Sequence, residues 1–136
     1  MLASPLTVPD GQARAEKFVM VVDDESTVRL LLEATIQGGP YRLLTAGDGE
    51  EALAAARRYH PAVIFLDVSM PKLDGFETCR RLKSDPATRD IRIIMLTAKA
   101  QAEDRARGRQ VGVDAYFTKP FSPLELLRSL EGYLAG

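Results

Sequence analysis

The chain has 136 residues, which is the size of one ordinary domain. Its 46% hydrophobic and 27% charged residues suffice for a core and exclude an intrinsically disordered protein. A formal net charge of -1 excludes a bulk attraction to nucleic acid or to an anionic membrane. One cysteine and one histidine exclude an internal disulfide and a multi-histidine metal site, and such sparse cysteine favours the cytoplasm.

Residues 1–16 contain Pro5, Pro9 and Gly11 and lack the basic start and apolar run of a signal peptide. Nowhere does an apolar stretch approach the roughly 18 residues that a membrane-spanning helix needs. We therefore expect a flexible N-terminal tail at 1–16, one domain at 17–136, and a cytoplasmic protein that does not enter a membrane.

Five short apolar runs rich in β-branched residues are the predicted strands. They are Phe18 to Val22, Tyr41 to Thr45, Ala62 to Leu66, Ile91 to Leu96, and Val113 to Phe117. Three of these runs are nearly continuous in apolar character, as is typical of strands that are buried on both faces of a parallel sheet.

Segments with helical periodicity separate the predicted strands. Their apolar stripes are Val28, Leu31, Leu32, Thr35 and Ile36; then Ala52, Leu53 and Ala56; then Phe76, Cys79 and Leu82. A fourth helix is predicted at 101–110, but arginines crowd it and Gly108 weakens it, so we expect it to be poorly anchored to the sheet.

Capping signals mark the start of three helices. In each, a capping side chain stands three residues before a glutamate that can bond back to the amide of the cap. The pairs are Asp48 with Glu51, Asp74 with Glu77, and Ser122 with Glu125, and Pro123 occupies a first helical position. Strand and helix thus alternate five times, which predicts a doubly wound α/β fold with a five-stranded parallel sheet, for which the flavodoxin-like order 2-1-3-4-5 is the natural choice.

Polar residues follow four of the predicted strands. They are Asp23, Asp24 and Glu25 after the first strand, Asp67 after the third, Thr97 after the fourth and Lys119 after the fifth. Ligands of open α/β sheets bind outside the carboxyl ends of the strands, so these side chains are predicted to share one site.

The predicted cluster holds more negative charge than Lys119 can neutralise. Two carboxylates about 4 Å apart repel by about 4 kcal/mol at an effective dielectric constant near 20. Either the carboxyl pKa values rise or a divalent cation binds, and ligands that are all oxygen suit Mg²⁺ or Mn²⁺.

Asp67 is the candidate nucleophile. Its carboxylate needs no base to attack phosphorus, whereas His60 stands at the opposite, amino-terminal end of the third strand and cannot activate a hydroxyl at the site. Lys119 and the metal would neutralise charge, and Thr97 can donate a hydrogen bond to a transferred oxygen.

The segments VMVVDDE, VIFLDVSMPKLDGFE, IIMLTA and DAYFTKPFSP resemble the receiver domain of two-component response regulators, over residues 17–134. The resemblance implies Mg²⁺ ligands at Asp23, Asp24, Asp67 and the backbone carbonyl of Ser69. It also implies that Asp67 is phosphorylated by a sensor histidine kinase, a phosphotransfer protein or a small phosphodonor, and that Thr97 and Lys119 hold phosphoryl oxygens. Tyr116 then corresponds to the aromatic switch residue, and the peptide bond between Lys119 and Pro120 to a cis bond.

The same resemblance implies a non-enzymatic phosphoprotein that binds a downstream target through the fourth helix, fifth strand and fifth helix. Ser69 and Lys99 occupy positions that tune the lifetime of the phosphate. Three alternatives stay open: the receiver piece of a larger regulator or hybrid kinase, a Mg²⁺-dependent phosphatase acting through an aspartyl phosphate, and a flavodoxin-like electron carrier. The phosphatase is disfavoured because Ser69 stands where a second acid would act, and the carrier because acids follow the first strand.

Overall fold

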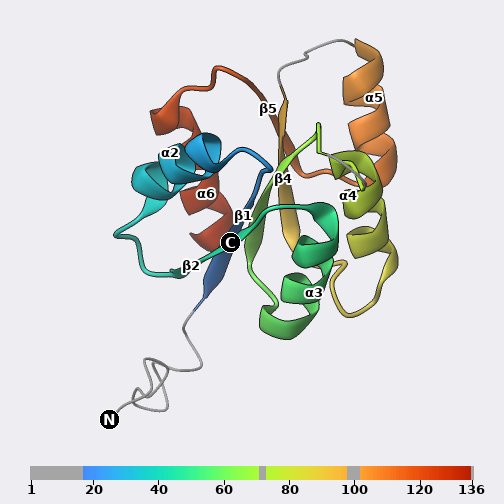
Figure 1. The fold of residues 1–136 in the computed structure, drawn as a ribbon, viewed down its shortest axis with the longest axis horizontal. Helices are drawn as coiled ribbons and strands as arrows, with labels where there is room; N and C mark the ends of the chain where they lie inside the picture. Colours follow the sequence, from blue (N-terminus) through green and yellow to red (C-terminus); the bar gives the residue numbers. More distant parts are fainter. Residues whose placement is uncertain (1–16, 71–72, 98–101, 136) are drawn as a thin grey trace.

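The computed structural model describes the backbone of residues 17–70, 73–97 and 102–135, and the side chains of all of these except 102–104. Five strands alternate with five helices (Figure 1). In chain order the elements are β1 (Phe18–Val22), α2 (Ser26–Ile36), β2 (Arg42–Ala46), α3 (Gly49–Tyr59), β3 (Val63–Asp67), α4 (Gly75–Ser84), β4 (Arg92–Thr97), α5 (Ala102–Val111), β5 (Ala115–Thr118) and α6 (Pro123–Ala135). The tail predicted at 1–16 lies outside the described residues.

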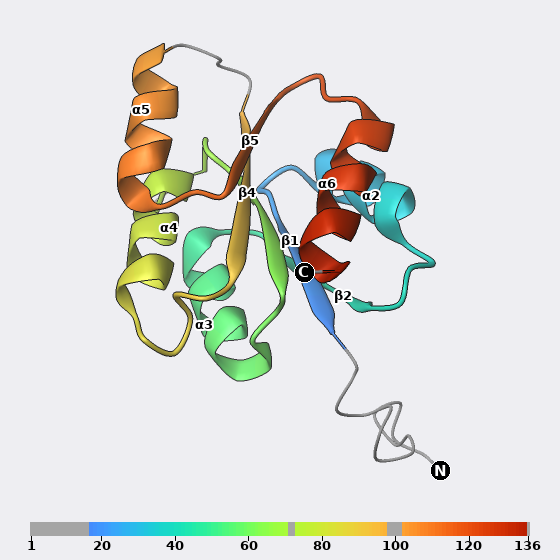
Figure 2. The same cartoon turned by 180° about the vertical axis from the view of Figure 1, so that it is seen from behind.

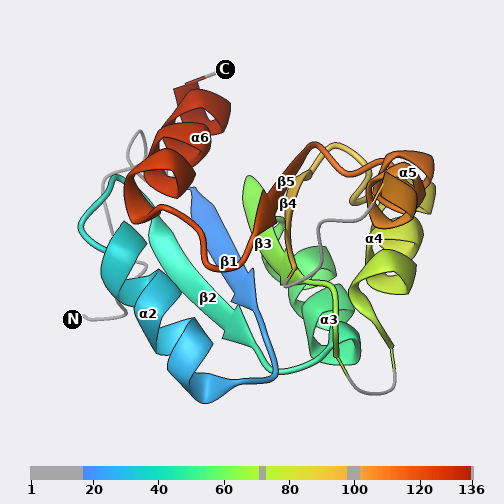
Figure 3. The same ribbon diagram turned by 90° about the horizontal axis from the view of Figure 1, so that it is seen from above.

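All strand pairs are parallel and the sheet order is β2-β1-β3-β4-β5, which confirms the predicted doubly wound topology. Helices α2 and α6 cover one face of the sheet, and α3, α4 and α5 cover the other, as the views from behind and from above show (Figures 2 and 3). Among the described residues, no helix is both long enough and apolar enough to cross a bilayer.

The central strands carry two cores because successive side chains point to opposite faces. In β1, Met20 and Val22 pack toward α3 and α4, whereas Val19 and Val21 pack toward α2 and α6. All four are fully buried, and each such aliphatic side chain contributes about 1.5–3 kcal/mol through removal from water. Cys79 belongs to the first core, as expected for a small apolar residue.

The helix starts agree with the predicted caps. Side-chain oxygens of Asp48, Asp74 and Ser122 accept hydrogen bonds from the backbone three residues later, at 2.9, 2.9 and 3.3 Å. The predicted hydrogen bond between the glutamate and the amide of the capping residue is wrong in two helices. Glu51 accepts instead from the amide of Gly47, while Glu77 pairs with the neighbouring arginines of α4.

One expectation about packing is corrected. Leu31 was assigned to the buried stripe of α2, but it is 54% exposed and Leu30 is 63% exposed, because the helix packs through Val28, Leu32 and Ile36. The described part of α5 packs through Val111, which lies against the first core, and through its arginines. Arg105 lies over the ring of Tyr116, with its Cζ 5.4 Å from the ring centroid.

Candidate functional site

The carboxyl ends of β1, β3, β4 and β5 bring together the polar residues predicted there. Asp67 is the last residue of β3 and is in register with Leu96 of β4, and the amide of Lys119 donates to the carbonyl of Thr97 at 2.6 Å. Asp23 is 0% exposed, Thr97 2% and Asp67 4%. Three polar side chains from three strands are therefore buried at one edge of the sheet.

Lys119 joins two of the acidic residues. Its Nζ lies 3.2 Å from Asp23 Oδ2 and 3.2 Å from Asp67 Oδ1, in a partly buried position. One ammonium group thus faces two buried carboxylates, which leaves an excess of negative charge when both are ionised. A second cation would relieve that excess.

The electrostatics of Asp67 reflect this excess. Burial and, after it, the negative charge of Asp23 raise the pKa of Asp67, Lys119 opposes both effects, and the net result is a pKa of about 6. Burial lowers the pKa of Lys119, but the charges of Asp67 and Asp23 outweigh that effect and the net shift is upward. Lys119 is therefore a stable cation at neutral pH.

The loop after β1 concentrates further acids. Carboxylate oxygens of Asp23, Asp24 and Glu25 lie within 4.8 Å of one another. The loop is held in place because Asp23 Oδ1 accepts from the amide of Glu25 at 2.9 Å, and the guanidinium of Arg29 donates to the carbonyl of Asp23. A buried carboxylate beside two exposed ones, with oxygen as the sole donor type, fits a hard divalent cation such as Mg²⁺.

Gly75, the first residue of α4, allows that helix to approach Asp67 closely. A Cβ built at Gly75 would lie 2.3 Å from the carbonyl oxygen of Asp67, and the Gly75 amide donates to the Val68 carbonyl at 2.9 Å. A side chain at this position would push α4 away from the end of β3.

The remaining predicted residues fall in different places. Ser69 is exposed two residues beyond Asp67, and Tyr116 is half-buried in β5. The bond between Lys119 and Pro120 is cis, as the resemblance implied. Lys99 lies outside the described residues.

His60 lies away from this site, as expected from the sequence. It follows α3 at the amino edge of the sheet, where its Nε2 is 2.9 Å from Asp90 Oδ1. It is the non-glycine residue with positive φ among the described residues, at 47°.

Sequence reasoning missed three contributions to the site. Glu25 was noted at the strand end but not counted as a possible ligand, and Arg29 and Gly75 received no role. A signal existed for Arg29: it stands one helical turn beyond Glu25, so its long side chain can reach back to the loop.

Buried acids and one lysine thus lie together at the carboxyl edge of a 2-1-3-4-5 sheet. The comparison with protein families identifies the class of protein to which this arrangement belongs. The family model described as "Response regulator receiver domain" matches residues 19–131. The chain therefore belongs to the response regulator receiver domain family, and it is a receiver domain of two-component signalling.

Similar proteins include both short and long regulators. Protein PilG of Pseudomonas aeruginosa is 42% identical over 116 residues, covering 85% of this chain and 86% of PilG. "Probable transcriptional regulator ycf27" of Cyanophora paradoxa is 47% identical over 118 residues, covering 85% of this chain but 48% of that protein. The chain thus spans about half the length of this curated relative.

The fold is that of a solved chemotaxis protein. The structure of CheY4 of Vibrio cholerae has a TM-score of 0.81 and 35% sequence identity, covering 87% of this chain and 98% of CheY4. Members of the receiver family are mostly phosphoacceptor signalling modules that typically bind Mg²⁺ at an acidic pocket and interact with histidine kinases or phosphotransfer proteins.

Proposed function

We propose that Asp67 accepts a phosphoryl group, with Mg²⁺ bound beside it, from a sensor histidine kinase or a histidine phosphotransfer protein. The observation that carries the proposal is the position of the Lys119 Nζ, 3.2 Å from both Asp23 and Asp67. That geometry places a buried carboxylate next to a fixed positive charge and a group of acids that favours a divalent cation.

The chemistry needs no general base. A carboxylate oxygen of Asp67 attacks phosphorus, so a P–O bond forms while the P–N bond of the phosphohistidine breaks. The bonding electron pair returns to the imidazole nitrogen of the donor. Lys119 stays close to the transferred oxygens, and catalysis consists of positioning and charge neutralisation.

The metal site proposed here consists of Asp23, Asp24, Asp67 and the backbone carbonyl of Ser69. Bound Mg²⁺ supplies positive charge next to the phosphoryl oxygens. Asp23 is already held by its bonds to Lys119 and the Glu25 amide. Glu25, whose carboxylate lies within 4.8 Å of the other two acids, adds negative potential at the rim of the same site.

The switch part of the proposal concerns Thr97 and Tyr116. Thr97 is buried at the end of β4, in register with Thr118 of β5, and Tyr116 lies two residues earlier in β5. A hydrogen bond from the Thr97 hydroxyl to the phosphate would shift the end of β4 and the packing of Tyr116. Because Arg105 of α5 lies over that ring, repacking of Tyr116 changes the surface formed by α5, β5 and α6, which we propose binds the downstream target.

The phosphodonor is proposed to dock over α2. This helix starts directly after the acidic loop, and its Leu30 and Leu31 are exposed by more than half. Exposed leucines beside a buried reactive group offer a surface against which helices of a kinase or phosphotransfer protein can pack.

The proposed receiver occupies residues 17–136 and acts in the cytoplasm, without direct binding of nucleic acid or membrane, whether alone or as part of a larger regulator. We propose a stoichiometric phosphoprotein rather than a turnover phosphatase. Position 69, two residues beyond Asp67, is a serine, which cannot act as the general acid of a phosphatase.

Incubation with a small phosphodonor and Mg²⁺, followed by intact-mass measurement and peptide mapping, tests this function. We expect one base-labile phosphate per chain, located on Asp67 and lost in Asp67→Asn. Asp90→Asn is the matched control, since it makes the same change at the amino edge and should leave labelling intact. Label on another residue, or many turnovers of phosphodonor per chain, would overturn the proposal.

A further inference from the structure

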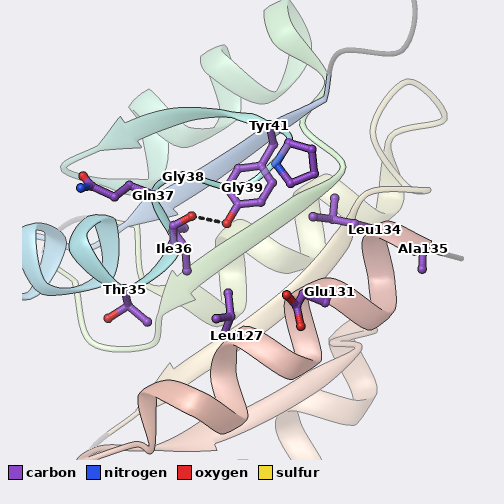
Figure 4. A pocket seen from close by; sticks show the side chains of 11 residues that line it. Thr35, Ile36, Gln37, Gly38, Gly39, Tyr41, Leu127, Glu131, Leu134 and Ala135 are labelled. Atoms are coloured by element: carbon purple, nitrogen blue, oxygen red, sulfur yellow. Dashed lines mark hydrogen bonds between the residues drawn. The ribbon is translucent and has the colours of Figure 1, made fainter.

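An apolar groove lies between the C-terminal ends of α2 and α6, at the amino edge of the sheet (Figure 4). It is about 520 Å³ in volume, and its apolar lining includes Ile36, Tyr41, Leu127 and Leu134. The hydroxyl of Tyr41 donates to the Ile36 carbonyl, so the ring is held in the groove wall. The groove is remote from the acids at the carboxyl edge.

The turn between α2 and β2 leaves the groove uncovered. Gly38 has φ of 92°, and a Cβ built on it would have no neighbour within 4 Å. Gly39 and Pro40 continue the turn, so no long side chain from 38–40 reaches over the apolar walls. The groove can therefore accept side chains from another segment.

The chain that precedes β1 begins at the rim of this groove. Lys17 donates from Nζ to the carbonyl of Leu134, a lining residue, at 2.8 Å, and its own carbonyl accepts from the Arg42 amide at 2.8 Å. Residue 17 is thus tied to the groove through its side chain and to the start of β2, next to Tyr41 of the groove, through its backbone. The sixteen residues before it start from that point.

These sixteen residues include apolar side chains that can fill the groove. Leu2, Leu6 and Val8 are apolar, and Val8 stands nine residues before Lys17. Nine extended residues span up to about 30 Å, which is ample to return along the groove. Removing such side chains from water contributes about 1.5–3 kcal/mol each.

The groove offers one charged side chain. Glu131 is the charged member of the described lining, and α2 and α6 both end beside the groove, where helix C-termini carry partial negative charge. Residues 1–16 contain one cation, Arg14, and two acids, Asp10 and Glu16. Arg14 stands three residues before Lys17, so a segment docked from Lys17 can place this cation near Glu131.

We propose that the N-terminal segment of this chain docks in the α2–α6 groove, with Leu6 and Val8 against its apolar walls and Arg14 near Glu131. The segment precedes the family match, which begins at residue 19. Composition alone predicts a flexible tail, and the groove gives that tail a place to bind. Docking covers the last turn of α6 and does not depend on phosphorylation of Asp67.

Paramagnetic broadening in the full chain tests the proposal. A nitroxide on Ala3→Cys labels a single site, because the native Cys79 is fully buried. We expect the methyl resonances of Leu127, Leu134 and Ile36 to lose most of their intensity while those of Ile64 in the core are unchanged. Leu6→Asp alone and Val8→Asp alone should each restore much of the intensity, and Thr7→Asp, which places the same single charge between them, should not.

Three results would overturn the proposal. The first is no broadening at the groove residues, and the second is equal broadening in the spin-labelled chain and in all of its Asp variants. The third is broadening that comes from the segment of a second molecule. The last is read from a dilute mixture in which the spin-labelled chain is isotopically silent and the observed chain lacks the spin label. Broadening in that mixture would assign the groove to the segment of another molecule. The unchanged Ile64 signal reports that each variant is folded.

Discussion

Acidic side chains lie at both edges of the sheet, but their surroundings differ. At the carboxyl edge, Asp67 is buried beside Asp23 and its pKa is raised to about 6. At the amino edge, a hydrogen bond from His60 lowers the pKa of Asp90, and the Ala87 amide together with Arg57 lowers that of Asp85. Carboxylates of the same type are thus destabilised as anions at one edge and stabilised at the other.

This contrast shows how the domain separates reactivity from stability. At the amino edge, Asp85 and Asp90 pair with Arg57 and His60 at the end of α3, and Asp114 joins α4 to β4. At the carboxyl edge, two buried acids share one lysine, an arrangement that ionises with difficulty and is relieved by an added cation. The proposed phosphoacceptor, Asp67, is therefore a carboxylate whose charge the fold itself leaves poorly satisfied.

The largest effect should follow from removing the lysine at the carboxyl edge. Lys119→Met leaves Asp23 and Asp67 without their shared cation, so we expect the free energy of unfolding to fall by about 3 kcal/mol at about pH 8 without Mg²⁺. Urea denaturation measures this change. A loss below about 1 kcal/mol would show that Lys119 is not the main neutralising group.

The strongest network at the amino edge should rank next. Asp114 Oδ2 accepts from Lys83 Nζ at 3.0 Å and from the Ile93 amide at 2.8 Å. Asp114→Ala leaves both partly buried donors without this acceptor, so we expect a loss of about 2 kcal/mol in the same denaturation assay. An unchanged urea midpoint would mean that this edge does not depend on its paired acids.

Neutralising Asp67 should act in the opposite direction. The folded-state pKa of Asp67, about 6, exceeds the ordinary value of 3.8. At a pH between these two values, Asp67 is therefore protonated in the folded state and ionised in the unfolded state. The resulting stability is complete below the lower value and is lost as pH rises through the higher one. At about pH 8 without Mg²⁺, the free energy of unfolding of Asp67→Asn should therefore be about 1–3 kcal/mol higher than that of the wild type. Near pH 4 the two proteins should be about equally stable.

Equal stability of the two proteins at both pH values would contradict this prediction. Asp90→Asn is the matched control, since it makes the same substitution where the carboxylate pKa is lowered. It should not stabilise the protein at alkaline pH.

The smallest effect should come from an exposed pair at the amino edge. Arg57 Nε lies 3.4 Å from Asp85 Oδ2, and both side chains are substantially exposed. Arg57→Ala should change the free energy of unfolding by less than about 0.5 kcal/mol. A larger loss would show that the exposed pairs, and not only the partly buried network around Asp114, stabilise this edge.

Much of the fold could be predicted because the hydrophobic period and the capping residues are local patterns, whereas the strand order 2-1-3-4-5 was chosen as the natural order for five strands of a doubly wound sheet. The polar strand ends were harder to place. The predicted third and fourth strands stop at Leu66 and Leu96, whereas β3 and β4 extend to Asp67 and Thr97. These polar residues remain in the ladder because the paired backbone, rather than apolar character, sets the end of a strand.

Long side chains were predicted least well. Leu31 fits a helical stripe by spacing, yet α2 packs on the sheet through Val28, Leu32 and Ile36 and leaves Leu31 exposed. Arg107 reads as a solvated charge, but its Cζ lies 4.4 Å from the centroid of the Phe76 ring. At the site, the sequence indicated which strand ends carry the acids, whereas the sharing of Lys119 between Asp23 and Asp67 depends on tertiary geometry.

The most direct test of the account is an NMR titration of the Asp67 carboxyl carbon, performed with and without Mg²⁺. We expect a pKa of about 6 for the metal-free protein, which falls when Mg²⁺ is added because the cation stabilises the carboxylate. A metal-free pKa near the ordinary 3.8, or a value that Mg²⁺ does not change, would contradict the claim that unrelieved charge prepares Asp67 to accept a phosphoryl group.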